Sequence, residues 1–100
     1  MIVLIVQHTV RDFDAWKPVF DEHEPTRRKH GSTGHMVYRG VDNPNEIAVL
    51  SLWPTRQQAE AFAGDPTLGE AMARGGVVGE PRVTMTEDVE SRDYEQQRVA

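Results

Sequence analysis

The chain has 100 residues and a formal net charge of −5 at pH 7, with 16 acidic side chains against 11 Lys and Arg. A chain of this length can build one hydrophobic core but not two, so a single domain is expected. The acidic balance argues against nucleic acid and anionic membranes as partners. The absence of cysteine excludes disulfides, thiolate nucleophiles and cysteine-ligated metal sites.

The first predicted element is a strand over residues 2–9. Its opening run, Ile2-Val3-Leu4-Ile5-Val6, is too short for the apolar region of a signal peptide and has no basic segment before it, so a cytoplasmic protein is expected. The run is continuously apolar rather than alternating, which is typical of a central strand covered on both faces.

A helix is predicted next, with Asp12 as its N-cap. One stripe of this helix, at three- and four-residue steps, consists of Phe13, Trp16, Phe20, His23 and Arg27. Prolines at 18 and 25 predict kinks, or a break near Glu24-Pro25, because proline removes a backbone donor. The basic run of residues 27–30 is interpreted as a C-terminal cap, and Gly31 as the left-handed stop.

Residues 33–40 and 46–53 predict two strands of a hairpin, since the turn formers of residues 41–45 separate them. Thr55 and Gln58 form a capping-box signature for a second helix, which Gly64 ends. Asp65-Pro66 starts a further helix that stops at Gly75-Gly76.

A last strand is predicted over residues 82–88, with Val83 and Met85 on one face, after an extended segment at 77–81. Residues 90–100 are polar and charged, with only Tyr94 and Val99 available for burial. We therefore expect one domain over residues 1–89 and a polar C-terminal tail over residues 90–100.

This order of elements predicts an α+β fold of the ferredoxin-like βαββαβ kind, with the antiparallel strands in the order 4-1-3-2 and helices on one face only. The other face would be exposed in a monomer, so a homodimer is expected. The strand directions place His8 and Arg39 at one end, and His23, His35 and Trp53 at the other.

Several motifs make the chain resemble small bacterial proteins of the dimeric α/β-barrel superfamily over residues 1–88. These are His8-Thr9-Val10 before Asp12-Phe13-Asp14-Ala15-Trp16-Lys17, Tyr38-Arg39-Gly40, Asp42-Asn43-Pro44-Asn45, and Ala71-Met72 followed by Gly76-Val77-Val78-Gly79. The superfamily includes antibiotic biosynthesis monooxygenases, polyketide cyclases and haem-degrading monooxygenases. The resemblance implies a cleft between sheet and helices, a homodimer, and chemistry on aromatic substrates without metal or flavin. The haem branch is set aside because residues 55–74 contain no histidine.

Three residues are candidate catalytic groups. His8 and His23 could each act as a general base, or could be structural histidines satisfied by hydrogen bonds. Arg39 could hold a carboxylate, enolate or phenolate, but an ion pair with Asp42 or Glu46 is the favoured interpretation.

Further residues are predicted to line a cavity sized for a planar apolar molecule, although each could equally fill the core. They are Trp16, Phe20, His35, Tyr38, Trp53, Met72 and Met85. No metal is expected, since the histidine spacing matches no metal motif.

Our leading hypothesis is a cofactor-independent enzyme that cyclises, isomerises or oxygenates an aromatic or polyketide-like molecule after proton abstraction by histidine. One alternative is a non-catalytic or stress-response barrel that binds a small apolar or aromatic ligand. The other alternative is a purely structural dimeric module.

Overall fold

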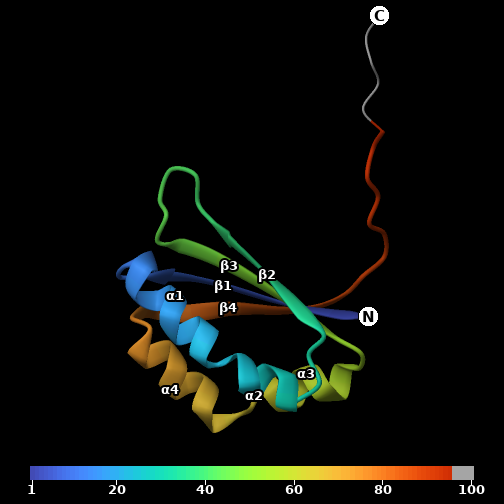
Figure 1. Ribbon diagram of the computed structural model, residues 1–100, viewed down its shortest axis with the longest axis horizontal. Coiled ribbons are helices and arrows are strands. Elements are labelled where there is room, and N and C mark those ends of the chain that lie inside the picture. The colour runs from blue at the N-terminus through green and yellow to red at the C-terminus, as the bar shows by residue number, and fades with distance from the viewer. Residues whose placement is uncertain (96–100) are drawn as a thin grey trace, which may run out of the picture.

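The computed structural model describes residues 1–95 and has four strands and four helices in that range (Figure 1). The strands are β1 (Ile2–Val10), β2 (Gly34–Arg39), β3 (Glu46–Trp53) and β4 (Val77–Glu87). The helices are α1 (Phe13–Glu22), α2 (Glu24–Lys29), α3 (Arg56–Ala63) and α4 (Pro66–Arg74). The predicted ferredoxin-like α+β fold is confirmed, and each helical connection consists of two short helices.

The sheet order is β2-β3-β1-β4 and every neighbouring pair is antiparallel, as the sequence predicted. Ile47 is opposite His8 on one side and Arg39 on the other, whereas His35 is opposite Ser51, farther along β3. The register therefore confirms that His8 and Arg39 share one end of the sheet and that His35 is at the other.

The last strand begins earlier than predicted. Val77 and Val78 pair with Val10 and Thr9, although the sequence suggested that β4 starts near residue 82. The pairing register shifts between Gln7 and Thr9, and Gly79 in this stretch has a φ of 72°. A bulged pairing with β1 thus brings the extended segment of residues 77–81 into the strand.

The break predicted in the first helical connection is confirmed. His23 is both the C-cap of α1 and the N-cap of α2, and Pro25 occupies the first turn of α2, where its missing donor costs nothing. Gly31 has a φ of 101° and ends the segment. This break places the His23 side chain at a junction between two helices.

The core lies between the sheet and the helices, which all cover one face (Figure 1). Leu4 and Trp53 are the largest fully buried side chains, and the Trp53 ring stacks on Phe62 with 5.0 Å between ring centroids. Trp53 Nε1 donates a hydrogen bond of 2.8 Å to Ser51 Oγ. These contacts anchor α3 on the end of β3.

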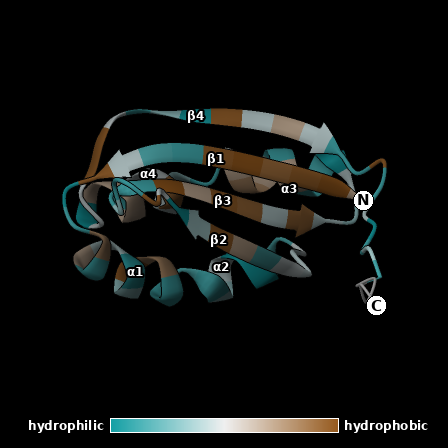
Figure 2. Cartoon of the chain, turned by 90° about the horizontal axis from the view of Figure 1, so that it is seen from above, coloured by the Kyte–Doolittle hydropathy of each residue, from teal (hydrophilic) through white to brown (hydrophobic). Residues whose placement is uncertain are grey.

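Within residues 1–95 no helix covers the opposite face of the sheet (Figure 1), and β1 and β3 contain hydrophobic stretches (Figure 2). Because neighbours along a strand alternate between faces, burial of Leu4, Val6, Ser51 and Trp53 places Val3, Ile5, Leu50 and Leu52 on this open face. All four are partly exposed, and Tyr38 beside them is 54% exposed. We call this group of five side chains the open-face patch.

Among residues 1–95, no helix has the length and apolar character needed to cross a membrane. Residues 88–95 follow β4 without regular structure, and Tyr94 in this segment is exposed. The predicted tail continues to residue 100, so Val99 lies outside the described residues.

Candidate functional site

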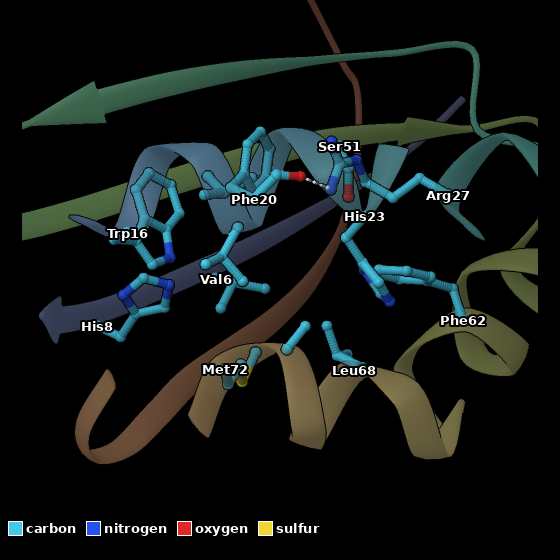
Figure 3. Close-up of a pocket in the computed structure, with 13 residues that line it drawn as sticks. Val6, His8, Trp16, Phe20, His23, Arg27, Ser51, Phe62, Leu68 and Met72 are labelled. Atoms are coloured by element: carbon cyan, nitrogen blue, oxygen red, sulfur yellow. Dashed lines mark hydrogen bonds between the residues drawn. The ribbon is translucent and has the colours of Figure 1, made fainter. Parts of the chain in front are cut away.

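A cavity lies between the inner face of the sheet and the helices α1, α2 and α4 (Figure 3). Its walls are mostly apolar, with Val6, Trp16, Phe20, Leu68 and Met72 among the lining residues. Its polar lining consists of His8, His23, Arg27 and Ser51. Apolar walls with a few convergent polar groups are typical of small-molecule sites.

The cavity volume is about 60 Å³. A water molecule needs roughly 10–15 Å³ on this measure, so the space admits a group of a few heavy atoms. Sites for drug-sized ligands measure roughly 300–1,000 Å³. The cavity is therefore smaller than the planar ligand expected from the sequence would need, unless lining side chains move.

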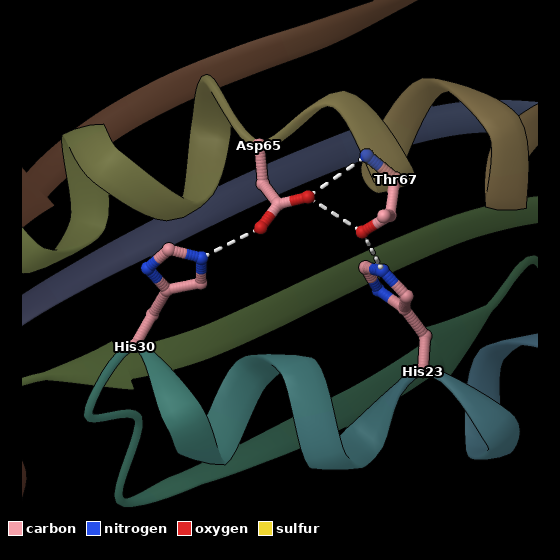
Figure 4. Close-up of polar contacts among 4 residues, drawn as sticks. All are labelled: His23, His30, Asp65 and Thr67. Carbon is pink, nitrogen blue, oxygen red and sulfur yellow. Dashed lines mark hydrogen bonds and ion pairs between the residues drawn. The ribbon is translucent and has the colours of Figure 1, made fainter.

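His23 is held in place by a hydrogen-bond chain that starts on α4 (Figure 4). Its Nε2 lies 3.0 Å from Thr67 Oγ1, and the Thr67 hydroxyl donates to Asp65 Oδ1. The other Asp65 oxygen accepts a hydrogen bond of 2.7 Å from His30 Nε2. The chain thus joins both ends of α2 to the N-terminus of α4.

This chain sets which nitrogen of His23 carries the proton. Thr67 has one hydroxyl proton, which it donates in a hydrogen bond to Asp65. Thr67 Oγ1 therefore accepts a hydrogen bond from His23 Nε2. In the neutral ring Nδ1 is then unprotonated, and it makes no hydrogen bond within residues 1–95. The hydrogen bonds from Thr67 and His30 hold the pKa of Asp65 well below its usual range. The carboxylate therefore stays ionised and continues to accept the hydrogen bond from the Thr67 hydroxyl.

Both histidines of the cavity are neutral at pH 7. Burial lowers the pKa of His23, and the neighbouring Arg27 guanidinium lowers it further. Burial also lowers the pKa of His8, whose ring packs edge-on against Trp16 at 5.6 Å. The Nδ1 atom of His8 is buried and has no hydrogen-bond partner in the described part of the chain. Each ring therefore has a nitrogen that can accept a proton or bind a ligand.

Among residues 1–95, Arg27 is the one Lys or Arg that lines the cavity, and it is only 4% exposed. Its Nη1 donates a hydrogen bond of 3.0 Å to the Phe20 carbonyl oxygen. Its guanidinium carbon lies 3.9 Å from the centroid of the Phe20 ring. Nε and Nη2 are buried and have no partner within residues 1–95. Arg27 lies in the last turn of α2, as expected for the basic run, but its side chain is buried and binds a carbonyl near the C-terminal end of α1.

Five of the predicted site residues line the cavity: His8, Trp16, Phe20, His23 and Met72. Two others, Tyr38 and Arg39, line a separate hollow at the end of the sheet that His8 also borders. The Arg39 guanidinium lies 4.7 Å from the Phe13 ring centroid, and within residues 1–95 it forms no ion pair with Asp42 or Glu46. The ion pair expected for Arg39 is thus replaced by stacking.

The other three predicted residues do not line the cavity. Trp53 is fully buried in the core and Met85 packs against the same cluster. His35 packs edge-on against Phe20 at 5.0 Å and borders an outer hollow together with Arg27. No group of three or more metal-ligating side chains is found in residues 1–95, so His23 and His35 do not form part of such a cluster.

Sequence reasoning missed Arg27, Ser51, Phe62 and Leu68 as lining residues. A signal existed for Arg27, because it follows His23 by four residues and Phe20 by seven on one helical stripe. Its position on that stripe was recognised, but Arg27 was interpreted as part of a C-terminal cap and not as a lining residue.

Comparisons with known proteins agree with this architecture. No protein-family model matches the chain. No curated protein matches it either. Among solved structures, a Bordetella bronchiseptica protein assigned to the antibiotic biosynthesis monooxygenases superposes with a TM-score of 0.76 at 16% identity, over 89% of this chain and 97% of that one.

A second similar structure is SnoaB, a cofactor-independent oxygenase from Streptomyces nogalater, with a TM-score of 0.74 at 12% identity over 90% of this chain and 94% of SnoaB. A Deinococcus radiodurans protein of the monooxygenase group matches with a TM-score of 0.69 at 13% identity, over 96% of this chain and all of its own. The chain has the fold of the antibiotic biosynthesis monooxygenases. This is the ferredoxin-like fold that the resemblance implied. At these identities the match establishes the fold and leaves the reaction to be argued from the site.

Proposed function

We propose that the chain is an enzyme that removes a proton from a small aromatic or polyketide-like molecule bound in the cavity, without a cofactor. The observation that carries this proposal is a mainly apolar cavity lined by His8 and His23, whose pKa values are lowered by burial so that the neutral form is favoured. A general base must be unprotonated at the working pH and within reach of the bound molecule. The likeness of the fold to a cofactor-independent oxygenase supports the same class of chemistry.

His23 is our candidate for the base. Thr67 fixes its ring orientation and holds the proton on Nε2, so Nδ1 receives the substrate proton. The Asp65 carboxylate, through Thr67, then stabilises the imidazolium that forms. The proton leaves a carbon or hydroxyl of the substrate, and its electron pair remains as an enolate or phenolate that can cyclise, isomerise or react with dioxygen. His8 is the second candidate base, because its Nδ1 is buried without a partner.

The protein works as a homodimer in this proposal. The open-face patch is apolar and lies at the centre of a sheet face that no helix covers. Exposed apolar patches of this kind mark association sites, and a second copy would bring an equivalent patch. The cytoplasmic location expected from the sequence remains a prediction.

Deuterium exchange tests proton removal without knowledge of the later steps. The protein is incubated in D₂O with a panel of small enolisable ketones and phenols, and deuterium incorporation is followed by mass spectrometry. We expect catalysed exchange with at least one compound, and a loss of roughly 10²–10⁴-fold in His23→Gln, the range typical of a removed general base. Arg28→Gln, which changes an exposed side chain on α2, serves as the control.

Two results would redirect the proposal. Equal exchange rates in wild type and His23→Gln, with loss in His8→Gln, would transfer the role of base to His8. Ligand-induced thermal stabilisation with no exchange for any compound would favour the alternative of a non-catalytic binding barrel. The small cavity and its unpartnered Arg27 nitrogens fit that second function equally well.

A further inference from the structure

Arg27 is a buried cation with too few partners. It is only 4% exposed, and one of its nitrogens donates to the Phe20 carbonyl. Its Nε and Nη2 are buried without a partner in residues 1–95. Unpaired charges and unsatisfied donors are costly in a protein interior, and an arginine in this state needs an explanation.

The carboxylates nearest to Arg27, Glu24 and Asp21, do not form an ion pair with it. No acidic side chain lines the cavity, and Arg27 forms no ion pair within residues 1–95. Glu24 and Asp21 exert attraction from the helices, yet burial is the larger influence and lowers the pKa of Arg27. The neighbouring Glu24 carboxylate is instead 3.8 Å from Arg28.

The guanidinium of Arg27 has a fixed orientation, and two of its nitrogens lack a partner in residues 1–95 although the residue lines the cavity. Phe20 covers the guanidinium at 3.9 Å and its carbonyl binds Nη1, which fixes the orientation of the fork (Figure 3). An oriented arginine fork matches the two oxygens of a carboxylate. His23 and Ser51 line the same cavity, so a bound carboxylate would also lie near the proposed base.

We propose that Arg27 is the anion-binding residue of this cavity and that the natural ligand is a small organic carboxylate with at most one ring. The cavity volume of about 60 Å³ admits a few heavy atoms, so acetate fits the cavity as it stands and a single-ring carboxylate such as benzoate requires lining side chains to move. The carboxylate pairs with Nε and Nη2, and the apolar part of the ligand packs against Phe20, Leu68 and Met72. This inference rests on the proposed function in that it requires the cavity to take up a small molecule.

The test compares carboxylates with neutral analogues of the same shape. Acetate and benzoate are titrated against acetamide and benzamide at constant ionic strength, and binding is measured by calorimetry and by thermal shift. We expect the carboxylates to bind at least about tenfold more tightly than the amides, and Arg27→Met to lose at least about tenfold of that affinity. Arg27→Lys keeps the positive charge but loses the planar fork of donors, so it should retain part of the affinity for carboxylates. Arg28→Met, at an exposed and adjacent arginine, should bind as wild type does.

The unliganded melting temperature separates a binding role from a structural one. Replacing an unpaired buried charge by an apolar side chain is neutral or stabilising, so Arg27→Met should melt at or above the wild-type temperature. A melting temperature below that of both wild type and Arg28→Met would show that Arg27 holds the fold together and would overturn the proposal. Equal binding of carboxylates and amides, or no binding of either, would also overturn it.

Failure of this inference differs from failure of the proposed function. Exchange of neutral ketones that depends on His23, combined with no preference for carboxylates, removes the role of Arg27 and keeps the enzyme. Carboxylate binding that depends on Arg27, combined with no exchange, keeps the anion site and removes the enzyme.

Discussion

Replacing Leu50 by aspartate should dissociate the proposed dimer. Leu50 is opposite Ile5 on one side and Met36 on the other, at the centre of the open face. Burial of one leucine side chain contributes about 1.5–3 kcal/mol. A two-fold interface contains each residue twice, so the two copies contribute about 3–6 kcal/mol. At about 1.4 kcal/mol for each tenfold, the dissociation constant should rise by roughly 10²–10⁴.

Sedimentation velocity over a range of protein concentrations measures this shift. Val41→Asp makes the same kind of change at a fully exposed turn residue and should leave the dissociation constant unchanged. Leu50→Ala should raise the dissociation constant by less than Leu50→Asp does. Circular dichroism checks that each variant is folded. A folded Leu50→Asp protein with the wild-type dissociation constant, or a wild type that is monomeric throughout, would refute the reasoning.

Three further predictions concern the cavity. Thr67→Val removes the hydroxyl that holds His23, so the rate of deuterium exchange should fall about tenfold or more and the pH profile of exchange should shift. A purely structural role for Thr67 would leave the pH profile unchanged. Folding lowers the pKa of His8 and His23, so the unfolded chain binds more protons than the folded one. The stability that these two histidines contribute should be complete above about pH 6.5 and should fall as the pH is lowered. A variant with both histidines replaced by Gln should therefore show a weaker dependence of the melting temperature on pH between about pH 7.5 and 5.5. Ala71→Leu should fill the cavity and weaken benzoate binding at least about tenfold. The melting temperature should change by no more than about 8 °C. Unchanged benzoate binding would place the ligand elsewhere.

Local signals in the sequence were sufficient for most of the fold. The caps at Asp12, Thr55 and Asp65 and the stop at Gly31 act over three or four residues, and each is where it was predicted. The start of β4 was mispredicted because pairing with β1 through a bulge stabilises residues 77–81, and pairing partners 67 and 69 positions away leave no local pattern.

The site was only partly predictable for a related reason. Helical spacing placed Trp16, Phe20 and His23 on one inward stripe, and all three line the cavity. Spacing alone does not say where a long side chain ends, so Arg27 was interpreted as part of a helix cap and Arg39 as a partner in an ion pair. The contact of His23 with Thr67 spans 44 residues and depends on how α4 packs beside α1, which composition and periodicity do not specify.

Long-range ¹H–¹⁵N correlation NMR of the His23 ring at pH 7 tests the central claim most directly, because it reads the protonation state of each nitrogen without a substrate. The account predicts a neutral ring with the proton on Nε2, and a shift toward the Nδ1–H form in Thr67→Val. A ring already protonated on Nδ1, or a doubly protonated imidazolium at pH 7, would contradict the assignment of His23 as the base.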